Sequence, residues 1–330
     1  MTIKVGSRKS KLALKQVEIV MRHLEIDDYE VVKFSTEGDK KSEMGYTQFD
    51  KLNFVEDIEN KLLSKDIDIA VHSAKDMPAE LNLNLDNYFI SDHKDGGYED
   101  LEIMNKDILI FRSDIEPVFK KDMRLGTSSL RRQMQAKFEL GAKNIGNLNG
   151  NIDTRIDKLE GGEFDCIILA YAGCSRLDFI ESRDDYCDFG KINAIPLYDH
   201  LTPTGQGMLC MQKNKDFMLP DSEWLEATLN TAVTSASDIN LSNISLTNRF
   251  LKEIGADCHS SLAVSAIGEL SENFNYSEIK CIIYGKSRSY FLHANGNKGE
   301  DGHKGEDQVL QDVLKEFYNV GGEDLLNEHN

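Results

Sequence analysis

The sequence predicts an α/β fold of two or three domains. Short runs of apolar, β-branched residues alternate with longer segments whose apolar residues recur at helical spacing, and two strand–helix–strand units are complete by residue 78. The length of 330 residues and the 40% apolar content are enough for sizeable cores. The chain has only 5 prolines and no low-complexity tract, which argues against a disordered protein.

The chain is acidic, since 38 Lys and Arg against 57 Asp and Glu give a formal charge of −19. This charge disfavours nucleic acid and anionic membranes as partners, so an anionic ligand needs a local basic cluster. No apolar stretch is long enough to cross a bilayer, and the first ten residues do not resemble a signal peptide. The six cysteines form no CxxC pair, so we expect reduced thiols in a cytoplasmic protein without a metal site.

The first unit consists of a strand over residues 2–5, a Gly6–Ser10 turn and a helix over residues 12–24. Ser7 or Ser10 can cap this helix, which would direct backbone amides and Arg8 at an anion. The alternative is an ordinary strand–helix junction with a solvated arginine. Next we expect a strand at 29–35, a mobile polar loop at 40–53 carrying Lys51 as a ligand contact or a solvated lysine, and a helix at 54–63.

The stretch from residue 67 to residue 78 is the centre of the predicted site. Ile67, Ile69 and Val71 predict a buried strand, and ligands in open α/β sheets bind beyond the carboxyl ends of the strands. The alternative is a strand end whose Lys and Asp are solvated. The polar residues that follow this strand are His72, Ser73, Lys75 and Asp76.

A similar junction lies at residues 124–133, where small and hydroxyl residues end a strand and begin a helix over 130–140. Arg131 and Arg132 stand in the first turn of that helix. Cations there oppose the helix dipole, so a purely structural reason for two of them is weak and we expect them to bind ligand carboxylates. The GK[ST] signature of a P-loop is missing.

The next segment carries Asn151, Thr154 and Arg155 into a helix that ends at Gly161. Residues 164–170, whose apolar run is unbroken from Cys166 onward, predict a buried strand of the parallel type, which is followed by Arg176. Cys166 and Cys174 are interpreted as core residues.

The remaining segments predict a crossing and a small further domain. Gly205 and Gly207 flank Gln206 in a turn that either approaches a ligand closely or crosses between domains. Helices are expected at 224–237 and 239–254, strands at 262–267 and 279–284, a solvated loop at 295–305, and a helix at 308–318 before an acidic tail. Cys258 lies in a polar loop after a helix, and is either a reactive thiol or a half-buried one.

These stretches together indicate a cleft for a ligand with several carboxylates, one acid at Asp76 and a possible covalent tether at Cys258. The cations that follow strand ends are Arg8, Lys75, Arg131, Arg132, Arg155 and Arg176.

The motifs also carry a resemblance to a known family. GSRKSKLAL, VHSAKDMP, GTSSLRRQ, NIDTRIDKLEGGEFDCIILAYAG, GQG and the loop around Cys258 resemble porphobilinogen deaminase, also called hydroxymethylbilane synthase, in order over residues 3–268. The resemblance implies a monomer of three domains, at 1–92 plus 207–223, 97–202 and 228–330. The first two would be similar to type II periplasmic binding proteins, and the third would be a small α+β domain.

The resemblance further implies a transferase of tetrapyrrole (haem) biosynthesis. A dipyrromethane cofactor would be bound by a thioether to Cys258, and four porphobilinogen units would be added to it with loss of ammonia. Asp76 matches the catalytic carboxylate, with Lys75 beside it, while Lys51 and Phe54 match the mobile loop and its aromatic residue. The matched cofactor-binding positions are Arg8, Ser10, Ser73, Lys75, Thr127, Ser128, Ser129, Arg131, Arg132, Arg155, Arg176 and Gln206.

Several positions depart from the family pattern. Asn149 stands where an arginine is usual, and one cofactor carboxylate would lose its cation there. The other departures are Glu37 for Arg, Phe49–Asp50 and Ala256–Asp257 for Gly–Gly, Thr247–Asn248 for Glu–Arg, and Ser261 for Pro.

These departures leave a second hypothesis open, a catalytically impaired paralogue or binding protein that keeps the carboxylate clamp. Retention of Asp76 and Cys258 favours the enzyme, because a clamp needs neither. A nicotinamide dehydrogenase is rejected, since no GxGxxG follows a strand.

Overall fold

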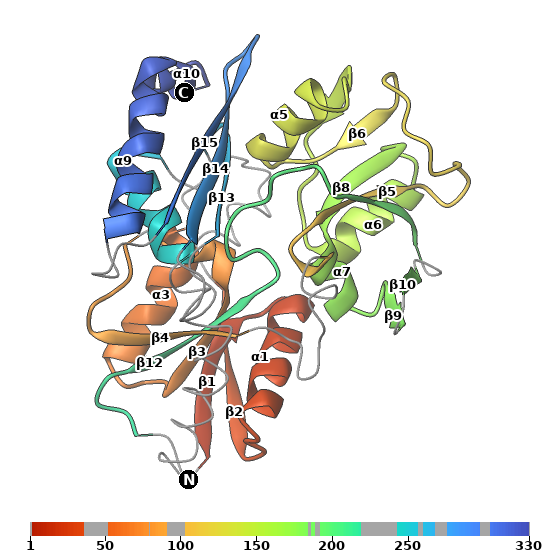
Figure 1. Cartoon of the computed structure of the whole chain (residues 1–330). Helices are drawn as coiled ribbons and strands as arrows, with labels where there is room; N and C mark the ends of the chain where they lie inside the picture. Colours follow the sequence, from red (N-terminus) through yellow and green to blue (C-terminus); the bar gives the residue numbers. More distant parts are fainter. Residues whose placement is uncertain are drawn as a thin grey trace.

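The structure is a computed structural model that describes residues 2–35, 52–78, 80–90, 103–183, 186–188, 192–218, 243–256, 260–267, 276–297 and 304–329. The described strands form two five-stranded sheets, a three-stranded sheet and a two-stranded pair. Figure 1 shows the first sheet at the bottom of the molecule, the second at the right and the third at the upper left. The mixed α/β class predicted from the sequence is confirmed. Within the described residues, no helix is both long and apolar enough to span a membrane.

The first sheet has the order β2-β1-β3-β12-β4. Strand β1 pairs in parallel with β2 and β3, whereas β12 pairs antiparallel with β3 and β4. Helix α1 packs on one face through Val17 and Val20, and α3 packs on the other face through Ile58 and Leu62. The elements are β1 (Ile3–Arg8), α1 (Lys11–His23), β2 (Tyr29–Phe34), α3 (Leu52–Leu63), β3 (Ile69–Ser73), a 3₁₀ turn (Ala74–Asp76), β4 (Leu85–Ile90) and β12 (Leu209–Asn214).

The second sheet has the order β11-β5-β8-β6-β7. Strand β8 is parallel to β6 but antiparallel to β5, so the expectation of a parallel-type strand is only half right. An unbroken apolar run indicates that a strand is buried on both faces, but it does not indicate whether the neighbouring strands are parallel or antiparallel to it. The elements are β5 (Asp107–Phe111), β6 (Arg124–Gly126), α5 (Leu130–Phe138), β7 (Asn144–Gly146), α6 (Ile152–Glu160), β8 (Cys166–Ala170), α7 (Tyr171–Arg176) and β11 (Asn193–Leu197). Between α7 and β11, the strands β9 (Glu181–Arg183) and β10 (Tyr186–Asp188) form the separate two-stranded pair.

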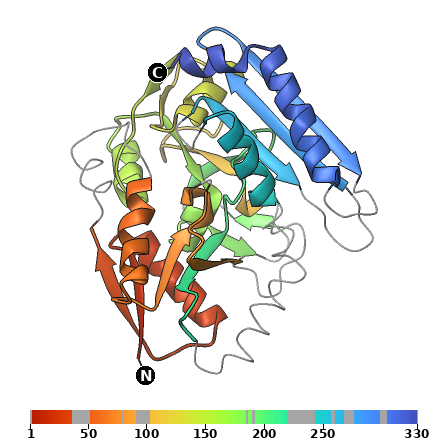
Figure 2. The same ribbon diagram turned by 90° about the vertical axis from the view of Figure 1, so that its left-hand side faces the viewer.

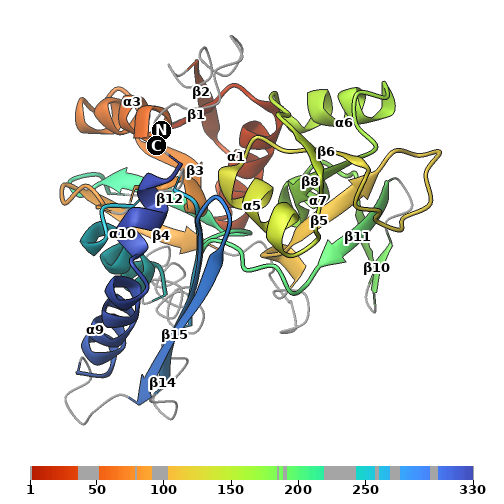
Figure 3. The ribbon, with the colours of Figure 1, turned by 90° about the horizontal axis from the view of Figure 1, so that it is seen from above.

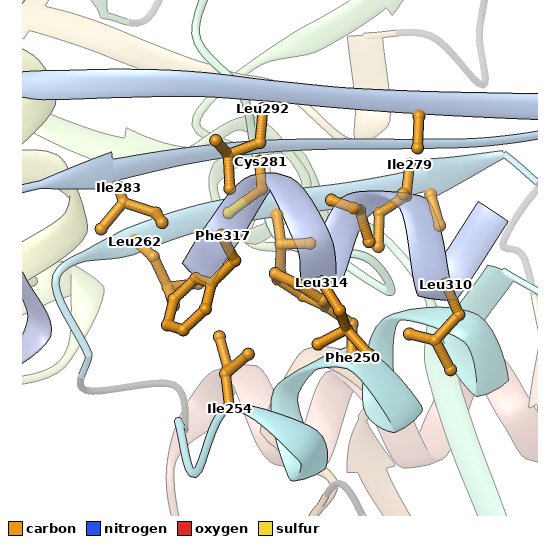
Figure 4. Packing of buried hydrophobic residues seen from close by; sticks show 14 of the residues in the cluster. Phe250, Ile254, Leu262, Ile279, Cys281, Ile283, Leu292, Leu310, Leu314 and Phe317 are labelled. Atoms are coloured by element: carbon orange, nitrogen blue, oxygen red, sulfur yellow. The ribbon is translucent and has the colours of Figure 1, made fainter. Parts of the chain in front are cut away.

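The third sheet is antiparallel and consists of β13 (Leu262–Ile267), β14 (Tyr276–Tyr284) and β15 (Ser289–Asn297). Helix α9 (Lys304–Asn319) lies along it, as Figure 2 shows, and residues 243–253 form a further helix. Figure 4 shows the resulting core, in which Phe250 and Phe317 meet edge to face with ring centroids 6.2 Å apart.

Two expectations for this part of the chain were wrong. Residues 295–297 were assigned to a solvated loop, but they continue β15, whose Leu292 and Ala294 are buried while Phe291, just before Leu292, is exposed. The segment expected to be an acidic tail contains helix α10 (Gly322–Asn327), because Leu325 is fully buried against the third sheet's core. Two leucines among acidic residues were therefore enough to dock the helix.

The parts of the chain that carry the first and second sheets are in contact where helix α1 meets helices α6 and α7. Helix α1 lies beside α7 in both Figure 1 and Figure 3. A Cβ atom at Gly173 would lie 2.7 Å from Cδ1 of Ile152 and 3.7 Å from Cδ2 of Leu12, so glycine permits the close contact. The Lys11 ammonium also lies 3.1 Å from the carboxylate of Asp153.

Candidate functional site

The turn after β3 carries Lys75 and Asp76. Its position is fixed by the residue just before β12, because the amide of Ala74 donates to the carbonyl of Met208 at 3.0 Å. On the opposite side, the hydroxyl of Ser73 accepts a hydrogen bond of 3.0 Å from Gln16 of α1. The strand end predicted from the sequence therefore projects Lys75 and Asp76 beyond the first sheet.

Arg8 and Ser10 lie at the next strand end. Strand β1 continues to Arg8 instead of ending at residue 5 as expected, because its pairing with β2 extends to Phe34. Ser10, one of the two candidate caps, is the N-cap of α1 and accepts from the amide of Ala13 at 3.2 Å. The start of α1 is therefore well defined beside the turn that carries Asp76.

His72 is the last buried polar residue of β3. Burial lowers the pKa of His72 to about 4, although the nearby Asp76 carboxylate acts in the opposite direction; Arg8 lowers it further. The imidazole is therefore neutral near pH 7. Its Nε2 atom has no hydrogen-bond partner within the described part of the chain.

Arg131 and Arg132 share one carboxylate, that of Asp107. Arg131 Nη2 lies 2.9 Å from Asp107 Oδ2, and Arg132 Nη2 lies 2.7 Å from Oδ1. The sequence indicated little structural reason for two arginines at this helix start, and that expectation is wrong. Both arginines form ion pairs with Asp107, a fully buried acid 24 residues before Arg131. Burial alone would raise the pKa of Asp107, but the two guanidinium groups outweigh it and hold this pKa well below its usual range. Sequence reasoning missed Asp107, whose only signal is an acid at the head of the apolar strand DILIF.

Gln206 connects the two sheets. Its side-chain nitrogen donates to Asp107 Oδ1 at 3.0 Å and to the carbonyl of Asn105 at 2.7 Å, while its oxygen accepts from Lys75 Nζ at 3.2 Å. We call residues 203–207 the crossing segment.

The backbone of the crossing segment explains its two glycines. Gly205 and Gly207 have φ angles of +81° and +90°. A Cβ atom at Gly207 would lie 2.6 Å from the carbonyl oxygen of Met104, and one at Gly205 would lie 3.2 Å from Ala74. The sequence left open whether this turn approaches a ligand closely or crosses between domains. The described backbone fits a crossing between the two sheets.

The turn before α5 presents hydroxyl groups. Thr127 Oγ1 accepts from the amide of Ser129 at 3.3 Å, and Ser129 is the N-cap of α5 without a side-chain cap bond. The Oγ atom of Ser128 is buried and has no hydrogen-bond partner among the described residues. A buried hydroxyl group without a partner in the protein is suited to form a hydrogen bond with a bound ligand.

Arg155 and Arg176 complete the cations of the second sheet. Arg155 Nε donates to the carbonyl of Gly150 at 2.7 Å, and burial together with Arg132 lowers the pKa of Arg155 to about 10, so it stays charged at neutral pH. Arg176 donates to the carbonyl of Gly207 at 2.5 Å. At the departure from the family pattern, the carbonyl of Asn149 accepts from Lys158 Nζ at 3.2 Å.

Three predicted site residues cannot be placed. Lys51 and Cys258 lie outside the described residues, and Phe54 belongs to α3 but its side chain is not described. Cys166 and Cys174 are confirmed as core residues, and burial raises the pKa of each thiol to about 12.

Comparisons with known proteins identify the family. Residues 3–218 match the family model of porphobilinogen deaminase described as its dipyrromethane cofactor binding domain. The chain belongs to the porphobilinogen deaminase family. It is 34% identical over 275 residues to the porphobilinogen deaminase of Streptococcus sanguinis, covering 80% of this chain and 81% of that one. It is 33% identical to that of Clostridium novyi, with 96% and 100% covered.

Solved structures add little to this assignment. Full-length BenM is similar over 71% of this chain and 68% of its own, with 10% identity and a TM-score of 0.39, which is too low to support an argument.

The residues present fit a dipyrromethane group that bears several carboxylates. Arg8, Lys75 and Arg155 supply positive charge in a chain of net charge −19. The buried hydroxyl of Ser128, in the turn before α5, supplies a hydrogen-bond donor that has no partner among the described residues. This match between donor set and ligand is independent of the family comparison.

Proposed function

We propose that this chain is a hydroxymethylbilane synthase, a transferase of tetrapyrrole biosynthesis. It would join four porphobilinogen molecules head to tail with loss of one ammonia each, and one water would release the linear product. The family membership supports this reaction. The observation that carries it is the Lys75–Gln206–Asp107–Arg131/Arg132 chain of contacts, which connects the acid-bearing turn of the first sheet to the cations of the second.

Asp76 is the proposed catalytic acid. Loss of ammonia requires a proton on the leaving amine, and a carboxylic acid beyond the end of β3 can supply it. The carboxylate that remains can stabilise the positive charge that develops on the substrate pyrrole. Lys75, held by Gln206, would bind a substrate carboxylate beside this acid.

The other site residues would bind and orient carboxylates. When bound through a thioether to Cys258, the dipyrromethane supplies the pyrrole carbon to which the first substrate is joined. Arginine suits this task because its planar guanidinium can bind a carboxylate with two parallel hydrogen bonds. The proposed cofactor-binding residues are Arg8, Ser10, Ser73, Lys75, Thr127, Ser128, Ser129, Arg131, Arg132, Arg155, Arg176 and Gln206, with Lys51 and Phe54 in the mobile loop.

We further propose that the sheets correspond to three domains, two of them similar to type II periplasmic binding proteins, at 1–92 plus 207–223, 97–202 and 228–330. The membership of β12 in the first sheet and of β11 in the second supports this division. A cytoplasmic monomer with porphobilinogen as its substrate completes the proposal.

The test is to incubate the purified protein with porphobilinogen and to quantify ammonia and linear tetrapyrrole together. We expect four ammonia molecules for each hydroxymethylbilane. Binding of porphobilinogen without release of ammonia would instead indicate the impaired paralogue, for which the departures at Asn149 and Ala256–Asp257 are the observations in favour.

A further inference from the structure

Asp107 is a buried charge that lies outside the sequence motifs and to which the proposed reaction assigns no chemical step. Its side chain is 0% exposed, and it is the first residue of β5. The backbone of Asp107 is in register with Ala170 of β8 on one side and Leu197 of β11 on the other. The neighbouring strands therefore hold the backbone of Asp107 in place, and Arg131, Arg132 and Gln206 hold its carboxylate.

The bonds to Asp107 determine how the two arginines are presented. A guanidinium has five N–H donors. Arg131 uses its donors on Asp107, Gln135 and the carbonyl of Leu201, and Arg132 uses two on Asp107 and one on the carbonyl of Ile168. Three donors of each group are thus directed into the protein, and the remaining two point in a fixed direction.

The carboxylate also permits two adjacent cations to remain charged in a buried place. Arg131 and Arg132 are each 7% exposed, and burial lowers the pKa of Arg131 while Asp107 counteracts this. Without the acid, two guanidinium groups would repel each other and Arg155 beside them. Removing Asp107 is therefore expected to drive at least one arginine toward solvent.

We propose that Asp107 is the positioning residue of the carboxylate site, orienting Arg131 and Arg132 toward the ligand and, through Gln206, holding Lys75 beside Asp76. The proposal rests on the proposed function for the identity of the ligand. The orientation of the arginines can be measured without turnover. The positioning role of Asp107 and the proposed synthase reaction can therefore be disproved separately.

The test uses Asp107→Asn, with Asp165→Asn as the matched control. Asp165 also lies between two arginines of the second sheet, at 2.8 Å from Arg124 and 3.5 Å from Arg112, but it precedes β8 at the opposite end of the β5–β8 pair. Each full-length variant is treated with phenylglyoxal, and the modified arginines are mapped by peptide mass spectrometry. Cofactor loading by intact mass, melting temperature, kcat and KM are measured in parallel.

In the wild-type protein we expect Arg131 and Arg132 to react slowly and the half-exposed Arg124 to react quickly. Asp107→Asn should raise labelling of Arg131 or Arg132 about fivefold or more and lower kcat/KM about 10- to 100-fold, mainly through KM. Asp165→Asn should leave labelling of Arg131 and Arg132 and kcat/KM unchanged, whatever its melting temperature.

A lower melting temperature for Asp107→Asn with unchanged arginine labelling and unchanged KM would reduce Asp107 to a structural role and overturn the proposal. Rapid labelling of both arginines in the wild type would overturn it as well, and this result does not require the variant to fold. Gln206→Met tests the connection to Lys75, because it removes the bridge and leaves both ion pairs. Its kcat should fall about fivefold or more without new arginine labelling, and an unchanged kcat would contradict that connection.

Discussion

The ammonium group of Lys75 donates a hydrogen bond of 3.2 Å to the side-chain oxygen of Gln206, 131 residues further along the chain. This contact joins the turn that bears Asp76 to the crossing segment. The same segment reaches the third sheet, since Thr204 Oγ1 lies 2.7 Å from Thr247 Oγ1 and accepts from the amide of Ala266 at 3.2 Å. One short segment therefore contacts all three sheets.

The contact between Thr204 and Thr247 gives the first prediction. Thr204→Val leaves the buried Thr247 hydroxyl and the Ala266 amide without their partner, so we expect a loss of about 1–3 kcal/mol in the free energy of unfolding. Denaturant unfolding of Thr204→Val, Thr247→Val and the double variant measures it. If the two single losses simply add, the hydroxyl pair contributes no coupling energy.

Asp76→Ala should separate cofactor loading from turnover. If Asp76 donates the proton to the leaving amine, its removal should lower kcat by about 10²- to 10⁴-fold and leave the mass added by the bound cofactor unchanged. Asp68→Ala is the matched control, because Asp68 precedes the same strand and accepts from the amide of Lys4 at the opposite end. Near-normal turnover by Asp76→Ala would remove this residue from its role.

His72 should make stability depend on pH. Because burial lowers the pKa of His72 to about 4 from 6.5, the unfolded chain binds a proton at a higher pH than the folded one does. The contribution of neutral His72 to the free energy of unfolding is therefore complete above pH 6.5. About 3 kcal/mol of this free energy is lost as the pH falls toward 4. Melting curves across this range should show a smaller loss for His72→Gln than for the wild type. Equal losses in the two proteins would show that His72 is not buried in its neutral form.

The buried thiols should be inert to alkylation. Burial raises the pKa of Cys166, Cys174, Cys210 and Cys281, and only a thiolate reacts quickly with iodoacetamide. In the native protein these four should stay unmodified, and Cys258 should react only in molecules that lack the thioether. Peptide mapping after brief alkylation checks both statements. Modification of Cys281 before denaturation would show that the third sheet's core opens readily.

Local signals predicted much of the first two sheets. Apolar runs located β3 and β8, and the serine at position 10 indicated the start of α1, because strand burial and helix capping depend on a few neighbouring residues. The functional motifs are local for the same reason. Arg131 and Arg132 could therefore be selected without a structure.

The partners of these motifs could not be predicted from the sequence. Asp107 and Gln206 become neighbours only when the crossing segment passes between the sheets, a contact 99 residues apart in the chain. The strand β15 was missed because polar His293 and Asn295 interrupt its apolar residues, although they stand on alternate positions of the strand. Pairing over long distances in sequence leaves little trace in either segment alone.

The most direct test of the account is the intact mass of the protein as purified, with Ehrlich's aldehyde reagent as a second readout. We predict that the wild type is heavier than its sequence by one dipyrromethane and gives the dipyrromethane colour, and that Cys258→Ser has its sequence mass and gives no colour. A wild type that keeps its sequence mass and stays colourless, even after exposure to porphobilinogen, would contradict the account.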